Sequence, residues 1–164
     1  MIRLARPEDV PRIHELIIEL ANYERLEHRA IGTPELLGEH LFGQTKYIET
    51  LVVEDGGRLV GFALFFPNYS TFLTLPGYWL EDLFVEPDSR GKGYGKALLR
   101  EIAQMALDRG FGRVDWAVLD WNKPSIEFYE SIGAAPLSDW ITYRLEGEAL
   151  ARCASLNKAG SPSK

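Results

Sequence analysis

The chain has 164 residues, of which 46% are hydrophobic and 26% are charged, the composition of a soluble globular domain that can bury a sizeable core. Its formal net charge of -6 argues against a general nucleic-acid binder, because affinity for a phosphate backbone depends on clustered lysine and arginine. No apolar run approaches a membrane span and the single Cys153 cannot form an internal disulfide, so we expect a cytoplasmic protein without membrane or nucleic-acid partners.

The first part of the chain predicts a strand, two helices and a β-hairpin. Residues 2–5 form a short strand candidate, and a helix capped by Asp9 follows it. The apolar residues of this helix recur at helical spacing: Val10, Ile13, Leu16, Ile17, Leu20 and Ala21. Thr33-Pro34 opens a second helix that Gly43 ends, with an inner side made of Leu36, Leu37, His40 and Leu41. Residues 47–54 and 58–66 predict two antiparallel strands around Asp55-Gly56-Gly57.

The second part alternates strands and helices. Segment 67–77 has two prolines and several small polar residues, which predicts a loop. Residues 78–85 predict a strand, 95–109 a long helix that Gly110 ends, and 112–119 another strand. A helix opened by Asn122 and ended by Gly133, a last strand at 141–145 and a short helix at 147–157 follow, before a small polar tail that we expect to be disordered. This order predicts an α/β fold with a mixed sheet and helices on both faces.

The most informative segment joins the 78–85 strand to the 95–109 helix. Arg90-Gly91-Lys92-Gly93-Tyr94-Gly95 lacks Cβ atoms at alternate positions, so a ligand can approach the backbone and successive amides can turn toward one anion. The following helix adds unpaired amides and its positive dipole end. Arg90, Lys92 and Lys96 supply compensating charge. The pattern predicts a phosphate-binding loop, and a tight strand-to-helix connection is the purely structural alternative.

Two other phosphate loops do not fit. A dinucleotide fingerprint needs G-x-G-x-x-G, and here the third glycine comes one residue too early. A nucleoside-triphosphate loop needs Gly-Lys followed by Ser or Thr, whereas Gly95-Lys96 precedes Ala97. Metal chemistry has no support either, because His14, His28 and His40 lie at no ligand spacing and one cysteine cannot build a zinc site. We expect no metal.

Two motifs together resemble one superfamily. Arg90–Gly95 is similar to the acyl-CoA signature Q/R-x-x-G-x-G/A of the Gcn5-related N-acetyltransferases, and the segment from Asn122 to Tyr129 is similar to their later N-x-x-x-x-x-x-Y segment. The resemblance implies a single N-acetyltransferase domain over residues 1–157, with a tail at 158–164. It also implies acetyl-CoA as the acetyl donor.

Further segments resemble the diamine acetyltransferase branch, which includes spermidine/spermine and thialysine N-acetyltransferases. These segments are 19–24, 69–72, 80–85 and 117–122. The chain departs from the branch after Leu137, where the acidic segment is shorter, and at Phe72, which replaces a tryptophan. The resemblance implies a small cationic amine substrate, of the thialysine, diamine or polyamine kind, and a homodimer. The apolar terminal residues Ala149, Leu150, Cys153 and Leu156 favour the dimer as well.

The loop and the resemblance together define two sets of binding residues. We expect acetyl-CoA at Leu83, Phe84, Val85, Arg90, Gly91, Lys92, Gly93, Tyr94, Gly95, Lys96, Asn122, Lys123, Pro124 and Ser125. We expect the amine at Tyr23, Glu24, Phe72, Glu81, Asp82, Asp115, Trp116, Ala117 and Asp139.

The reaction requires a proton acceptor and a proton donor. An alkylamine attacks a thioester only as the neutral base, yet it is almost wholly protonated at pH 7. The resemblance assigns the proton to Glu81, and because adjacent strand residues face opposite ways we expect at most one of Glu81 and Asp82 to face the amine. It assigns protonation of the departing thiolate to Tyr129. The structural alternatives are a solvent-facing charge pair and a packed tyrosine beside Phe128.

Two other functions stay open at this point. One is acetylation of a protein N-terminus or lysine side chain, which needs an open peptide groove. The other is a non-catalytic acyl-CoA-binding sensor, against which the presence of both Glu81 and Tyr129 argues.

Overall fold

A computed structural model describes residues 1–155. Its strands are β1 (Ile2–Leu4), β2 (Glu49–Asp55), β3 (Arg58–Ser70), β4 (Leu75–Val85) and β5 (Val114–Trp116). Its helices are α1 (Val10–Tyr23), α2 (Pro34–Phe42), α3 (Tyr94–Asp108), α4 (Lys123–Ser131) and α5 (Gly147–Ser155), with short 3₁₀ helices at Pro7–Asp9, Glu27–Arg29 and Pro87–Ser89. Within these residues, Met1–Ala117 form one compact unit and the residues from Val118 onward form a second.

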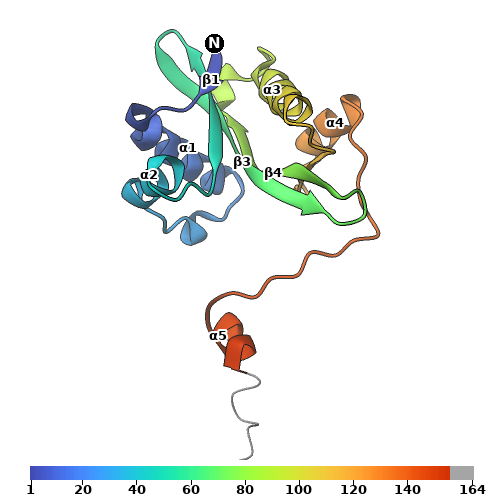
Figure 1. The fold of residues 1–164 in the computed structure, drawn as a ribbon. Coiled ribbons are helices and arrows are strands. Elements are labelled where there is room, and N and C mark those ends of the chain that lie inside the picture. The colour runs from blue at the N-terminus through green and yellow to red at the C-terminus, as the bar shows by residue number, and fades with distance from the viewer. Residues whose placement is uncertain (156–164) are drawn as a thin grey trace, which may run out of the picture. The chain divides into compact units, whose positions relative to one another are not determined.

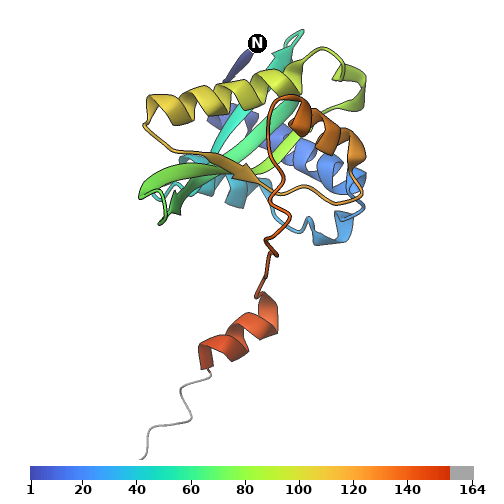
Figure 2. The ribbon, with the colours of Figure 1, turned by 90° about the vertical axis from the view of Figure 1, so that its right-hand side faces the viewer.

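The first unit is built on a five-stranded sheet of order β1-β2-β3-β4-β5. The first three neighbouring pairs are antiparallel, and β4 and β5 are parallel. Helices α1 and α2 lie on one side of this sheet and α3 on the other (Figures 1 and 2). The predicted mixed α/β sheet with helices on both faces is therefore confirmed.

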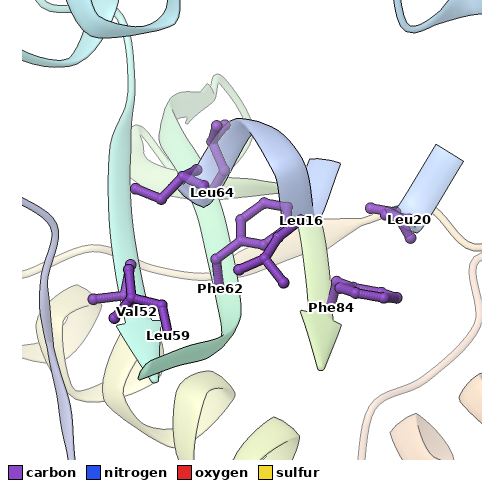
Figure 3. Packing of buried hydrophobic residues seen from close by; sticks show 8 residues of the cluster. Leu16, Leu20, Val52, Leu59, Phe62, Leu64 and Phe84 are labelled. Atoms are coloured by element: carbon purple, nitrogen blue, oxygen red, sulfur yellow. The ribbon is translucent and has the colours of Figure 1, made fainter. Parts of the chain in front are cut away.

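The core on the α1 face follows the two periodicities of helix and strand. Ile13, Leu16 and Leu20 recur every third or fourth residue of α1, and they pack with strand residues of one sheet face (Figure 3). The strand residues of this cluster are Val52, Leu59, Phe62, Leu64 and Phe84. The opposite face receives Leu98, Ile102 and Ala106 of α3, all buried. Between the irregularities of strand pairing, position along β3 and β4 thus tells which face a side chain occupies.

Most predicted elements are confirmed within a few residues. Gly56 and Gly57 have positive φ in the turn between β2 and β3, and Thr33 accepts a hydrogen bond from the Leu36 amide at the start of α2. Gly110 and Gly133 follow α3 and α4 with positive φ, and α5 covers the described part of the terminal helix. The expected tail at 158–164 lies outside the described residues.

The predicted loop at 67–77 is wrong. β3 continues to Ser70 and β4 begins at Leu75, so the segment forms a long hairpin with Pro67 opposite Tyr78. Proline is tolerated there because pairing of β2 with β3 ends at Phe65, and β3 is an edge strand on that side beyond this point. Strand composition alone did not reveal that the prolines lie at an edge.

The predicted strand at 141–145 is also wrong, and the strand at 112–119 is shorter than expected. Ile141, Tyr143 and Leu145 alternate as in a strand, but they are exposed and pair with no strand among residues 1–155. An alternating pattern gives a segment one apolar face. A strand also needs a neighbouring strand whose backbone groups pair with its own N–H and C=O groups. β5 keeps only the three residues that pair with β4.

Two local predictions in the first unit need correction. Asp9 precedes α1, but its carboxylate does not cap that helix; it accepts hydrogen bonds from the Arg6 amide at 2.7 Å and from the Arg3 guanidinium at 2.6 Å. Because both Asp9 carboxylate oxygens accept hydrogen bonds from Arg3, they do not accept one from the amides at the start of α1. Leu36 is 53% exposed, so the inner side of α2 is narrower than predicted.

Candidate active site

The glycine loop has the backbone that its sequence predicts. Gly91 and Gly93 have φ of 78° and 83°, in the left-handed region, and a Cβ added at either position would meet no atom within 4 Å. The glycines are therefore required by backbone conformation, and the space above them is open. Gly93 is the N-cap of α3, and the first bond within the helix runs from the Ala97 amide to the Gly93 carbonyl. The preceding amides of the first turn remain without a helical acceptor.

The side chains of the loop are tied to the surrounding unit. Arg90 donates from Nε to the Val85 carbonyl at 2.9 Å, and its guanidinium lies 4.9 Å from the Tyr23 ring centre. Lys92 donates to Asp55 at 2.9 Å, and this hydrogen bond, with a second one from Tyr94, lowers the pKa of Asp55. These contacts fix the loop against the end of β4 and the turn between β2 and β3.

A buried acid holds the start of the loop. Glu86, which follows β4 directly, accepts hydrogen bonds from both terminal nitrogens of Arg58 at 2.7 and 2.6 Å and one from Arg12 of α1. Its amide donates to the Val60 carbonyl at 2.9 Å. Glu86 is 8% exposed. A buried carboxylate with two arginine partners is a rigid anchor, because removing one partner would leave a charge uncompensated.

The loop follows an open edge of β4. β5 pairs with β4 only at Tyr78, Trp79 and Leu80, whereas pairing with β3 continues to Val85. Among residues 1–155, no strand pairs with the β5 side of β4 beyond Leu80. The predicted residues Leu83, Phe84 and Val85 therefore lie on a strand edge to which an extended amide-containing arm can add.

A β-bulge brings the two carboxylates of β4 together. Leu80 pairs with Phe65 and Asp82 pairs with the next residue, Leu64, so Glu81 is an extra residue on its strand. The strict alternation expected for Glu81 and Asp82 does not hold at such a bulge. Both carboxylates follow Leu80, the last residue of β4 that pairs with β5.

Asp82 has the most perturbed carboxylate of this group. It pairs with Leu64 of the α1-face cluster, and burial raises its pKa to about 7, with smaller contributions from the charges of Glu81 and Glu24. Burial also raises the pKa of Glu24, which follows α1. A carboxylate with a pKa near neutrality can take up and release a proton at physiological pH. The structure thus brings together the predicted residues Glu24, Glu81 and Asp82.

The other predicted substrate residues of the first unit take different places. Tyr23 lies beneath Arg90, and Asp115 forms an ion pair with Arg113 at 2.7 Å. Trp116 is the last residue of β5, and Ala117 follows it directly. Phe72 lies in the turn of the β3–β4 hairpin and is 93% exposed, about 20 Å along the strands from Asp82. The structure does not bring Phe72 to the carboxylates.

The second unit carries the remaining predicted residues. Asn122, buried, precedes α4, and the Ser125 and Ile126 amides donate to its backbone carbonyl. Lys123, Pro124 and Ser125 form the first turn of α4. Tyr129 lies further along α4, with its ring centre 5.2 Å from that of Phe128. Asp139 lies in a turn before the exposed segment described above.

Sequence reasoning missed three features of the site. The sequence does contain a signal for the bulge at Glu81, because two adjacent acidic residues interrupt an otherwise apolar strand. Trp79, whose indole N–H donates to Glu81 at 2.7 Å, lies two residues away on the same strand. The pair of Arg113 and Asp115 had a signal too, because residues two apart on a strand share a face.

Two properties of the described residues concern chemistry outside this site. No helix among residues 1–155 is long and apolar enough to cross a membrane. Within the same residues, histidine, cysteine and acidic side chains form no group suited to a metal ion.

Known proteins resemble the chain over most of its length. A model of the acetyltransferase (GNAT) family matches residues 13–134. The L-ornithine N5-acetyltransferase of Arabidopsis thaliana is 37% identical over 201 residues, covering 95% of this chain and 88% of that protein. The thialysine N-epsilon-acetyltransferase of Bos taurus is 38% identical over 161 residues, covering 92% and 94%. An integron cassette protein of V. cholerae has a TM-score of 0.79 and 25% identity, covering 94% and 96% of the two chains.

Proposed function

This chain belongs to the acetyltransferase (GNAT) family, and from this premise we propose that it moves an acetyl group from acetyl-CoA to a primary amine of a small cationic substrate. The membership predicted from two motifs is confirmed, and amine N-acetyltransferases are among its relatives. The amine attacks the thioester directly while both substrates are bound. One observation carries the proposal: β4 offers an open edge, leads into the glycine loop and holds the carboxylates at the point where β5 leaves it.

Acetyl-CoA suits the residues of this edge and loop. The open space above Gly91 and Gly93 and the unpaired amides of the first turn of α3 fit a pyrophosphate. The edge at Leu83, Phe84 and Val85 fits the amides of the pantetheine arm. Tyr94, Gly95 and Lys96 form the first turn of α3, and Asn122 to Ser125 belong to the second motif. The donor then supplies the activated acetyl group.

We propose different chemical roles for the two carboxylates of the bulge. Glu81, held by the Trp79 indole, and Glu24 bind the ammonium group of the substrate. Asp82 takes the proton before the nitrogen attacks, because a pKa of about 7 suits a general base at neutral pH. The motif had assigned this proton to Glu81. The new bond joins the amine nitrogen to the acetyl carbon as the C–S bond breaks, and the second proton that the nitrogen then loses replaces the one that the proton donor gives to the thiolate.

Tyr129 is proposed to give the departing thiolate its proton. A phenol with an ordinary pKa of about 10 and a thiol of about 8.5 are close enough for transfer in the transition state. The support is the second motif, in which Tyr129 occupies the last position. In this proposal the two units act as one acetyltransferase domain over residues 1–157, and the family match includes residues of both units.

Release of free thiol from acetyl-CoA tests the proposal. The panel contains ornithine, thialysine, butane-1,4-diamine, spermidine, spermine and a lysine-containing peptide. We expect turnover with small amines that carry a second cationic group, because three acidic residues surround the bulge. Turnover with the peptide alone would indicate a protein acetyltransferase instead. Binding of CoA with no thiol release across the panel would indicate a sensor.

Tyr129→Phe tests the proposed proton donor. The variant keeps the phenyl ring and its packing beside Phe128, so we expect acetyl-CoA affinity to stay unchanged. Turnover should fall by roughly 10²-fold or more, the range typical of one general acid. Phe128→Leu is the matched control for packing on the same helix. Near-normal turnover in Tyr129→Phe would assign the tyrosine to packing only.

A further inference from the structure

An arginine and an aspartate form a partly exposed pair on β5 and the residue before it. Arg113 Nε lies 2.7 Å from Asp115 Oδ2, and the side chains are 39% and 23% exposed. Asn68 of β3 donates to the same Asp115 oxygen at 3.1 Å. Neither terminal nitrogen of Arg113 donates to a side chain or carbonyl among the described residues. The pair therefore has two donors and one carboxylate oxygen to offer a ligand.

The pair lies on the same face of the sheet as the carboxylates of the bulge. Leu64 belongs to the α1-face cluster, and Asn68 follows it by two alternations along β3, so Asn68 and the Asp115 it contacts share that face. Asp82 pairs with Leu64 and lies on this face as well. Trp79 connects the two groups, since it pairs with Asp115 across the strands and donates its indole N–H to Glu81.

The distance between the two groups suits a short bifunctional molecule. Two residues along a strand advance about 6.6 Å and one strand spacing adds about 4.8 Å, so the Cα atoms of Asp115 and Glu81 are roughly 8 Å apart. An α,ω-diamino acid of the ornithine or lysine size spans this distance, with its terminal amine at the bulge and its α-carbon at Asp115, where the Arg113 guanidinium also lies.

The charges of the two groups of residues distinguish a diamino acid from a diamine. Glu24, Glu81 and Asp82 attract any ammonium, so they cannot distinguish a diamino acid from a diamine, and they repel a carboxylate. The α-carbon of an amino acid carries one ammonium and one carboxylate, and an adjacent aspartate and arginine complement both. A diamine would satisfy only the aspartate.

We propose that Arg113 and Asp115 recognise the α-carboxylate and α-ammonium of a diamino acid, whose terminal amine is the acetyl acceptor. Arg113 donates to the α-carboxylate, and Asp115 accepts from the α-ammonium. The inference rests on the proposed function and narrows its substrate class to α,ω-diamino acids over diamines. Arg113 is a specificity residue and takes no part in proton transfer.

The test compares ornithine with butane-1,4-diamine, which is the same molecule without the carboxylate. We expect the wild type to favour ornithine in kcat/KM. Arg113→Gln should lower kcat/KM for ornithine by about 10-fold to 100-fold, as expected for a lost hydrogen bond to a charged group, and leave the diamine within about twofold. Arg109→Gln is the matched control, because Arg109 is 42% exposed and pairs with Glu49 in the same unit. It should leave the ratio of the two substrates unchanged.

Calorimetric binding of ornithine to the wild type and to Arg113→Gln separates this inference from the proposed function. Weaker ornithine binding in the variant, with unchanged diamine binding, supports recognition by Arg113 even if no thiol is released. Absence of thiol release then overturns only the acetyltransferase proposal. A wild-type preference for the diamine, or an equal loss for both substrates in Arg113→Gln, overturns the inference. Circular dichroism and thermal melting establish that the variant is folded.

Discussion

Asp82 is the acidic residue of the bulge with the most strongly perturbed carboxyl group. Burial beside the α1-face cluster raises its pKa to about 7, and the charges of Glu81 and Glu24 act in the same direction. In the unfolded chain the same carboxyl titrates near 4. Folding therefore favours protonated Asp82, and the resulting stability is complete below about pH 4 and is lost as pH rises through 7.

Asp82→Asn should change both activity and stability in a pH-dependent way. We expect wild-type kcat/KM for the amine to rise through about pH 7, and the variant to lack this inflection and lose roughly 10²-fold or more in rate. Its free energy of unfolding should decline less than that of the wild type between pH 5 and 9. Urea denaturation and initial rates across this range provide the measurements.

Glu81→Gln is the informative companion variant. Removing the neighbouring charge lowers the pKa of Asp82, so the inflection in rate should move to lower pH without disappearing. An unchanged inflection in Asp82→Asn would show that another group, or the amine itself, titrates in this range.

At the residue scale, the sequence predicted which acidic residues lie near one another better than it predicted the surroundings of each. Glu24, Glu81 and Asp82 lie near one another, although alternation predicted opposite faces for Glu81 and Asp82, and our proposal of Asp82 as the base depends on a bulge and on burial. Both are tertiary properties: they follow from how β4 pairs with β3 and how α1 covers Leu64. The contact between Arg90 and the Tyr23 ring could not be predicted from the sequence either, because it joins residues that are distant in the chain.

At the scale of elements, the loop between β4 and α3 was the most predictable part of the molecule. Glycine spacing, a preceding apolar strand and a following helix are local signals, and all are confirmed. The β3–β4 hairpin was not predictable in the same way, because Pro67 argues against a strand unless the strand is known to be an edge. Glu86 and its two arginines add a long-range anchor to the loop that composition does not reveal.

Gly93→Val tests the loop as an acetyl-CoA site. Valine at φ of 83° is strained, and we expect a loss of about 1–2 kcal/mol in the free energy of unfolding. Acetyl-CoA affinity should fall below detection, because the backbone leaves the left-handed region and the added side chain fills the open space above it. Calorimetry measures the affinity and urea denaturation the stability.

Gly110→Val is a matched control at the other end of α3. Gly110 also has positive φ, 70°, and open space at its Cβ position, so the backbone strain is similar. This variant should lose comparable stability and keep its acetyl-CoA affinity. Equal affinity in both valine variants would remove the loop from the binding site.

At the scale of the whole molecule, apolar side chains of the second unit remain uncovered. Leu150 of α5 is 55% exposed and Cys153 is exposed, while Leu156 lies outside the described residues. Before α5, Ile141, Tyr143 and Leu145 are exposed as well. Exposed apolar residues that gather in one segment are typical of a surface that another molecule covers.

We predict that the chain forms a homodimer through this segment, as the diamine branch also implies. Sedimentation equilibrium should show a mass that rises from monomer to dimer with concentration, and Leu150→Glu should shift the equilibrium toward monomer, because a buried unpaired charge is costly. Leu107→Glu is the control, since Leu107 is 70% exposed on α3, in the other unit. A wild-type monomer at all concentrations would contradict the prediction, and equal effects of the two glutamates would contradict the role of α5.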